Sequence, residues 1–149
     1  MSFSNEEALK AALAAAATAA VEQVEEKVYT EFANNLNQYY GEFIPAEYIR
    51  TGALFGSLDR TGVASTGSGA SAEVFFTTPG YQQGLMQLQG TPIHGRYGWA
   101  TWSGEQVLDT AMHGSHGGYV GGTAIWDDSI SSLGDIRGLL IQALRAQGL

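Results

Sequence analysis

Hydrophobic and polar positions at the start of the chain follow a helical spacing, and they predict one long helix over residues 5–39. Nine of the thirteen residues in 8–20 are alanine, the strongest helix former. Ser4 is the expected N-cap, with Glu7 three residues later as in a capping box, and Gly41 suits the C-terminal end. Beyond the alanines, apolar residues recur at steps of three and four and share one helix face: Val21, Val24, Val28, Phe32, Leu36, then Tyr39 or Tyr40.

The predicted length of this helix is large for the size of the chain. A helix of about 35 residues spans roughly 50 Å at 1.5 Å per residue. A compact domain of this length is only about 30 Å across. The helix over residues 1–40 must therefore project, break near Thr18, or pack on a neighbouring subunit, and the sequence leaves these alternatives open.

The remaining pattern predicts shorter elements and a small, mostly antiparallel sheet, hence an α+β fold in a single domain over residues 1–149. A second helix is expected to begin at Pro45, because proline suits the first helical turn. The last helix has apolar residues at helical spacing, with Asp135 at its start and Arg145 near its end. The predicted helices are 45–59, 105–113 and 135–147, and the predicted strands are 73–78, 97–102 and a short edge strand at 123–126.

Two stretches are predicted as loop excursions. Residues 61–71 are rich in Gly, Ser and Thr, which indicates either a mobile surface loop or an arm that orders on assembly. Residues 79–96 show little periodicity and form the second excursion. The predicted core residues are Val24, Val28, Phe32, Leu36, Phe75, Leu108, Ile136, Leu140 and Leu144.

Composition narrows the possible partners. The net charge is −8 and no two of the seven basic residues are adjacent, which argues against a surface that wraps nucleic acid. The chain has no cysteine, which excludes disulfides and thiolate zinc sites. Charged residues within 22–27 interrupt the longest apolar run, so no membrane span is predicted, and the acidic Glu6 and Glu7 are unlike the start of a signal peptide.

Few side chains in the sequence are candidates for catalysis or metal binding. His113, His116 and Asp127 are the strongest combination for a metal-dependent hydrolase, but glycines interrupt the helical spacing between the two histidines. Ser115, His116 and Asp127 have no G-x-S-x-G elbow, and the Gly-rich 61–71 segment lacks the lysine of a phosphate-binding loop. The adjacent carboxylates Glu25 and Glu26 are expected on a solvated helix face. We therefore predict no catalytic residue, no metal ligand and no cofactor.

Several segments, read in order, carry a resemblance. The long helix leads into YYGEFIPAEYIRTGALFGSL at 39–58, followed by WSGEQVLDTAMHGSHGG at 102–118, TAIWDDSI at 123–130 and a final amphipathic helix. This order resembles the small neck and minor tail proteins of long-tailed bacteriophages. Many of these have a similar Tyr-x-Arg-Thr-x-x-Leu segment, matched here by Tyr48, Arg50, Thr51 and Leu54. Many also have a Gly-rich His-Gly turn before a Trp-containing segment.

The resemblance implies a non-enzymatic structural protein of the virion. It implies a cyclic homo-oligomer, commonly a hexamer, that completes the tail or joins head and tail and contacts neighbouring neck and tail proteins. DNA would pass nearby without specific binding, and an acidic lumen would repel its phosphates. The expected subunit-interface residues are Val21, Val24, Val28, Tyr39, Tyr40, Tyr97, Trp99, His113, His116 and Trp126.

Three alternatives remain open at this point. A tail terminator or minor tail component is the nearest. A metal-dependent hydrolase built on His113, His116 and Asp127 belongs to a different class. A scaffold or adaptor protein with a free-standing helical hairpin would be a monomer or dimer rather than a ring.

Overall fold

The computed structural model has an α+β fold, as the sequence predicts. The chain forms two compact units that share the first helix. The first unit comprises residues 1–31, 60–75 and 133–149, and the second comprises 32–59 and 76–132. The structure describes residues 5–42, 54–66, 69–77, 86–87, 101–102, 104–113, 115–116, 119–120 and 123–148, and between 86 and 120 it describes the side chains of 108, 109 and 111–113 only.

Helix α1 (Glu6–Gly41) is one unbroken helix of 36 residues, so the break near Thr18 does not occur. The hydroxyl of Thr18 donates to the carbonyl of Ala14 at 2.9 Å and remains satisfied within the helix. The side-chain oxygen of Asn5 accepts the N–H of Ala8 at 2.8 Å, which makes Asn5 the observed cap. Ser4, the predicted cap, lies outside the described residues.

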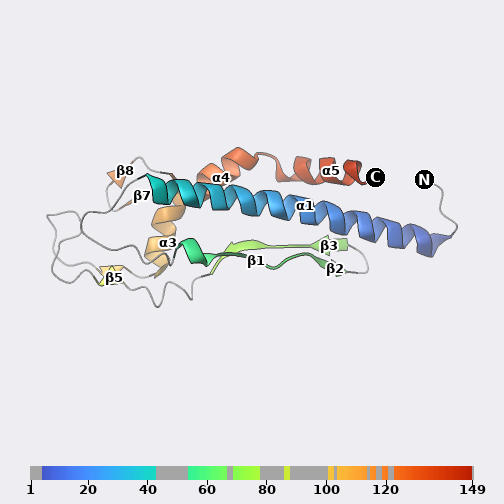
Figure 1. Cartoon of the computed structure of the whole chain (residues 1–149), viewed down its shortest axis with the longest axis horizontal. Helices are drawn as coiled ribbons and strands as arrows, with labels where there is room; N and C mark the ends of the chain where they lie inside the picture. The colour runs from blue at the N-terminus through green and yellow to red at the C-terminus, as the bar shows by residue number, and fades with distance from the viewer. Residues whose placement is uncertain are drawn as a thin grey trace. The chain divides into compact units, whose positions relative to one another are not determined.

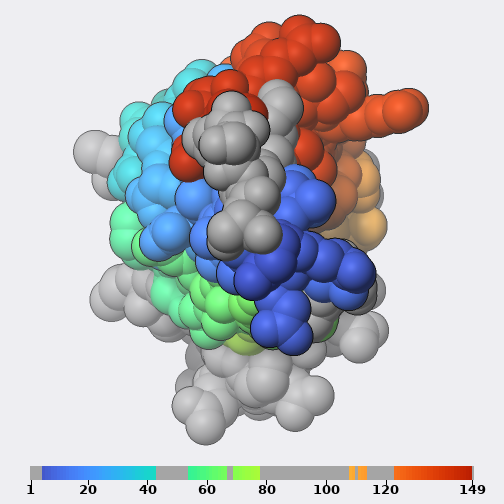
Figure 2. Space-filling view, turned by 90° about the vertical axis from the view of Figure 1, so that its right-hand side faces the viewer, coloured from blue at the N-terminus to red at the C-terminus, as the bar shows by residue number. Residues whose placement is uncertain are grey.

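In the first unit, α1 lies between a second helix and a β-hairpin (Figures 1 and 2). The helix is α5 (Ile136–Ala146), which confirms the predicted terminal helix. It follows a turn at Gly134, where φ is +64°. The hairpin contains β2 (Ala64–Thr66) and β3 (Gly69–Ser71), and it continues into β1 (Leu58–Arg60) and β4 (Val74–Phe76).

The hairpin corrects the prediction of a loop over 61–71. Ala64 pairs with Ser71 and Thr66 with Gly69 in an antiparallel ladder. β2 is exposed at each of its residues, so it lacks the alternation of apolar and polar residues that reveals a strand in a sequence. Its backbone hydrogen bonds, rather than burial, define it as a strand.

A one-residue offset divides this hairpin into two ladders. The N–H of Thr61 donates to the carbonyl of Glu73 at 3.0 Å, and the next residue pair toward the turn is Ala64 with Ser71. Two residues, Gly62 and Val63, therefore stand opposite one residue of the other strand. Gly62 has φ +70°, as in a β-bulge that begins with glycine.

The second unit contains the end of α1, the 3-10 turn η1 (Phe55–Ser57), α3 (Gly104–His113) and α4 (Ile125–Leu133). It also contains two antiparallel strand pairs of two residues per strand. These are β5 (Met86–Gln87) with β6 (Thr101–Trp102), and β7 (Ser115–His116) with β8 (Tyr119–Val120). Helix α3 confirms the prediction at 105–113.

Two predicted elements of this unit are corrected. In 45–59, the described residues form a single 3-10 turn and the strand β1, while 45–53 lie outside the described part. The predicted strand at 123–126 is instead the start of α4. The side-chain oxygen of Asp128 accepts the N–H of Ala124 at 2.9 Å, and this hydrogen bond at the helix start favours a helix over an extended strand.

The predicted core is partly confirmed. Phe32 and Leu36 are buried, whereas the predicted partners Val24, Val28, Phe75, Leu108, Leu140 and Leu144 are half-buried. Ile136 is 40% exposed, so its prediction as a core residue is wrong. It is the first residue of α5, a full turn before Leu139, where the stripe that faces α1 begins.

Candidate assembly surfaces

The first candidate surface is an apolar row at the N-terminal end of α1. Residues 9, 13, 16 and 20 follow steps of four, three and four and so share one helix face. Ala20 on this face is fully buried, but Leu13 is 41% exposed and Leu9 is 37% exposed. The first turns of α1 extend past the ends of α5 and of the β2–β3 hairpin (Figure 1), and Figure 2 looks onto this end of the helix. The apolar stripe therefore continues past the ends of α5 and of the β2–β3 hairpin, the described elements that flank α1.

A second row lies on the outer side of α5. Arg137, Ile141 and Arg145 are exposed and four residues apart, so they form one ridge of the helix. At 3.6 residues per turn this ridge is about 180° around the helix from Leu139 and Ala143, which face α1. Ile141 is 39% exposed, and neither arginine forms an ion pair within the described residues.

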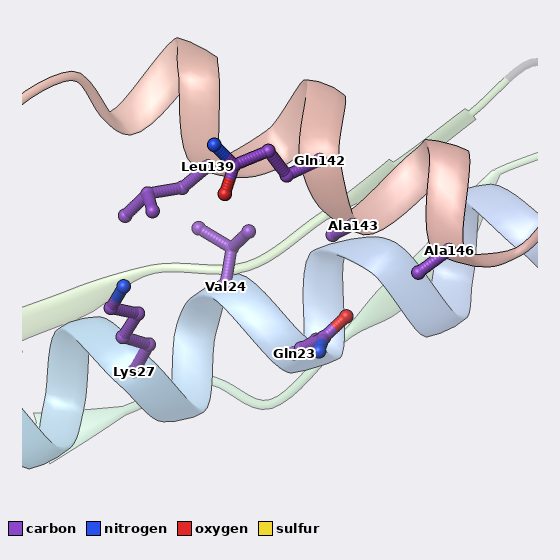
Figure 3. Close-up of a pocket in the computed structure, with 7 residues that line it drawn as sticks. All are labelled: Gln23, Val24, Lys27, Leu139, Gln142, Ala143 and Ala146. Carbon is purple, nitrogen blue, oxygen red and sulfur yellow. The ribbon is translucent and has the colours of Figure 1, made fainter.

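Between α1 and α5 the first unit has a hollow of about 160 Å³ that opens to solvent (Figure 3). Val24 and Leu139 line it from α1 and α5, with Val24 pointing toward α5, and Ala143 and Ala146 line its other end (Figure 3). Val24, an expected subunit-interface residue, thus faces α5 of its own chain.

A buried carboxylate connects α1 to the β-bulge. Glu25 is 8% exposed, and its side-chain oxygen accepts the N–H of Gly62 at 3.0 Å. Arg60 lies 3.9 Å from Glu25, forms an ion pair with Glu26, and stacks over the ring of Tyr29 at 4.6 Å. The hydrogen bond with Glu26 raises the pKa of Arg60 above its ordinary value.

Sequence reasoning missed this cluster. It placed Glu25 and Glu26 together on a solvated face, whereas the two side chains have different surroundings: Glu25 is buried and Glu26 is exposed. Adjacent residues on a helix point about 100° apart. The only signal in the sequence was Thr-Gly after Arg60, which is consistent with a bulge but also with any turn.

The expected interface residues Tyr39, Tyr40 and Trp126 belong to the aromatic core and rim of the second unit. Phe32 packs against Trp126 at 5.2 Å and Phe76 at 5.8 Å between ring centroids. Tyr40 meets the ring of Phe55 at 5.8 Å and accepts its N–H at 3.2 Å. Tyr39 lies edge-on to Tyr40. Trp126 is 42% exposed, so part of this indole is open to a partner.

Polar contacts tie the end of α1 to α4 in the same unit. The amide of Asn35 donates to the hydroxyl of Ser129 at 3.0 Å, and that hydroxyl donates to the carbonyl of Ile125 at 2.6 Å. The carboxylate of Glu42 accepts the N–H of Thr123 at 2.8 Å and also its hydroxyl. These bonds satisfy buried polar groups and fix where α4 begins.

Of the hydrolase combination, the structure brings two residues together. His113 Nδ1 lies 3.2 Å from each carboxylate oxygen of Asp127, and both side chains are more than half exposed. The side chain of His116 lies outside the described part, as do Tyr97 and Trp99. Among the described side chains, no three of His, Cys, Asp and Glu are grouped to hold a metal ion. The hydrolase alternative stays a prediction.

Val21 and Val28, the remaining expected interface residues, are half-buried on α1 in the first unit. Within the described helices, none is long and apolar enough to cross a membrane. Comparison of the chain with protein-family models, with curated proteins and with solved structures returned no match. The function must therefore be argued from the surfaces themselves.

Proposed function

We propose that this chain is a structural subunit of a tailed-phage virion, which forms a homo-oligomeric ring at the head–tail neck or tail end. The observation that carries the proposal is the exposed apolar row of Leu9 and Leu13, which continues the face of the buried Ala20 beyond the described ends of α5 and the β2–β3 hairpin. Single exposed leucines are ordinary on a protein surface. A row aligned with a packed helix face is typical of a surface that another subunit covers.

The energetics favour this reading over a free-standing helix end. Covering a large apolar side chain stabilises by about 1.5–3 kcal/mol when burial is complete. Leu9 and Leu13 are each more than a third exposed, so a substantial part of that stabilisation remains available to a partner. Alanines around them allow a partner's backbone to approach closely.

Charge also supports a virion role. A net charge of −8 would keep passing DNA from adhering to the inner wall of a ring. The resemblance to neck and minor tail proteins supplies the specific location. Of the residues that carry its first motif, Leu54 is buried at 6% exposure, and Tyr48, Arg50 and Thr51 lie outside the described residues.

Two measurements test the proposal together. Sedimentation of the purified protein gives its mass in solution, and a complementation assay adds it to heads and tails from a phage that lacks its coding sequence. We expect the protein to form a closed ring, alone or on these particles, and to restore joined virions. A protein that stays monomeric with the particles present, and leaves heads and tails separate, would contradict the proposal.

The hydrolase alternative has its own test. Zinc titration of the wild type against His113→Ala would show a loss of bound metal if His113 were a ligand. The proposed structural role predicts the same absence of stoichiometric zinc in both proteins.

A further inference from the structure

We infer that the apolar row of α1 in one subunit docks on the outer ridge of α5 in the next copy of this chain. Leu9 and Leu13 would pack beside Ile141, with the carboxylate of Glu6 in the first turn of α1 near one of the two flanking arginines. This inference rests on the proposed assembly into a ring and names the two surfaces that meet.

The two surfaces have matching chemistry. Ile141 stands alone on the solvent side of an amphipathic helix, with Arg137 and Arg145 one turn away on either side. The row of α1 has Leu9 and Leu13, and Glu6, three residues before Leu9, places a carboxylate on the same helix face. An apolar centre flanked by cations therefore meets an apolar centre with a carboxylate at one end. On a protein of net charge −8, such a local cationic ridge selects an acidic partner surface.

Among the described residues, the charged side chains of the two surfaces have at most weak ionic interactions. Glu6 pairs with Lys10 at 2.5 Å, but both side chains are at least 70% exposed. Exposed pairs of this kind contribute little and exchange easily. Arg137 and Arg145 have no ion pair within the described part of the chain, so the described residues leave both guanidinium groups available to a neighbouring acid.

The helix geometry also fits. Leu9 and Leu13 are four residues apart, as are Ile141 and each arginine, so both surfaces are ridges of the same class. Ridges of this class interdigitate when two helices cross at about 50°. In this packing, the ridge that contains Ile141 would lie in the groove beside the ridge of Leu9 and Leu13, which are about 6 Å apart along α1.

This contact joins two different surfaces of the subunit. A heterologous contact of this kind generates a ring when its rotation closes. Two helix faces cover less than the roughly 800 Å² per partner of a standard stable interface. We therefore expect dilute protein to associate weakly, and the test must trap the contact rather than rely on its lifetime.

The absence of cysteine in the sequence allows a direct cross-linking test. Leu13→Cys and Ile141→Cys are made as separate proteins, mixed, and oxidised, so that a bond between them can form only between copies. The control mixture pairs Leu13→Cys with Ser131→Cys, a similarly exposed site on α4. A disulfide requires Cβ atoms about 3.5–4.5 Å apart, so random collision traps little.

We expect the yield of disulfide-linked heterodimer to be several-fold higher for Leu13→Cys with Ile141→Cys than for the control mixture. Adding Arg137→Glu and Arg145→Glu to the Ile141→Cys protein should reduce this yield to the control level. Circular dichroism of each variant confirms that it is folded. Heterodimer at the control level would overturn the inference, and so would preferential linkage of Leu13→Cys to itself, which indicates a symmetric contact. If the wild type still joined heads and tails in that case, the proposed function would stand with a different interface. A strong heterodimer from a protein that fails to join them would sustain the contact and reject the phage role.

Discussion

The cores of the two units differ in the size of their buried side chains. In the second unit, the described core is built mostly of large residues, namely Phe32, Leu36, Leu54, Met112 and Ile125, together with the small Ala111. In the first unit, the buried apolar residues among those described are Ala20, Leu133 and Ala143. Alanine lets α1 and α5 approach closely, but each alanine removes little apolar area from water. The first unit therefore gains less from its own core.

The same contrast extends to polar contacts. In the first unit, the buried Glu25 ties α1 to the bulge at Gly62. In the second unit, Asn35, Ser129, Glu42 and Thr123 form bonds around an apolar and aromatic core. A small core with one buried carboxylate contributes less stabilising free energy than a larger core that also has several hydrogen bonds. This difference teaches that the first unit is the part of the chain with most to gain from a neighbouring subunit.

The largest expected effect lies in the second unit. Phe32→Ala removes a ring that packs against Phe76 and Trp126, and it should lower the free energy of unfolding by about 3–5 kcal/mol. Urea unfolding followed by circular dichroism measures the change. Phe55→Ala is the control, because that ring is 49% exposed and its loss should cost clearly less. Equal costs for the two variants would contradict the assignment of the core.

In the first unit, the corresponding test adds volume instead of removing it. Ala20 is fully buried, so Ala20→Leu should destabilise the protein by about 1–3 kcal/mol through overpacking. Ala15→Leu, at an exposed position of the same helix, is the matched control and should be nearly neutral because alanine and leucine are both strong helix formers. Stabilisation by Ala20→Leu would show that the helices are loosely packed there.

The buried carboxylate gives a third comparison. Glu25→Ala leaves the N–H of Gly62 without its acceptor, which should cost about 1–3 kcal/mol. Glu26→Ala removes an exposed carboxylate one residue away and should cost less. Thermal unfolding of the two variants in parallel separates a buried anchor from a surface pair, and a larger loss for Glu26→Ala would reverse our assignment.

Some elements of the fold could be predicted from the sequence, and others could not. The long helix, α3 and α5 were predictable, because apolar spacing over ten or more residues is a strong local signal. The β2–β3 hairpin was missed because β2 is exposed at each of its residues and shows no apolar alternation. The start of α4 was mistaken for a strand, since Thr123–Trp126 is rich in β-formers and the capping contact from Asp128 depends on the folded backbone.

The candidate surfaces divide in the same way. The apolar character of α1 was visible in the sequence, but its interface was predicted at Val21, Val24 and Val28, which are half-buried. The exposed residues lie further toward the N-terminus, at Leu9 and Leu13. A periodic pattern gives the face of a helix, but it does not say how far along that face the rest of the chain provides cover. That limit depends on where α5 and the hairpin end.

The smallest effect on stability should accompany the largest effect on assembly. Leu13→Ala changes an exposed side chain without disturbing helix propensity, so the free energy of unfolding of the subunit should change by less than about 0.5 kcal/mol. If the first unit uses this row to bind a neighbour, the same change should weaken ring formation and head–tail joining, because the partner loses the apolar area that it covers. Sedimentation and the joining assay measure this, with Ile130→Ala on α4 as the control at a similar exposure of 36%. If the variant unfolds and assembles as the wild type does, Leu13 is not part of the interface. The small core of the first unit would then be stable without a partner subunit at this row.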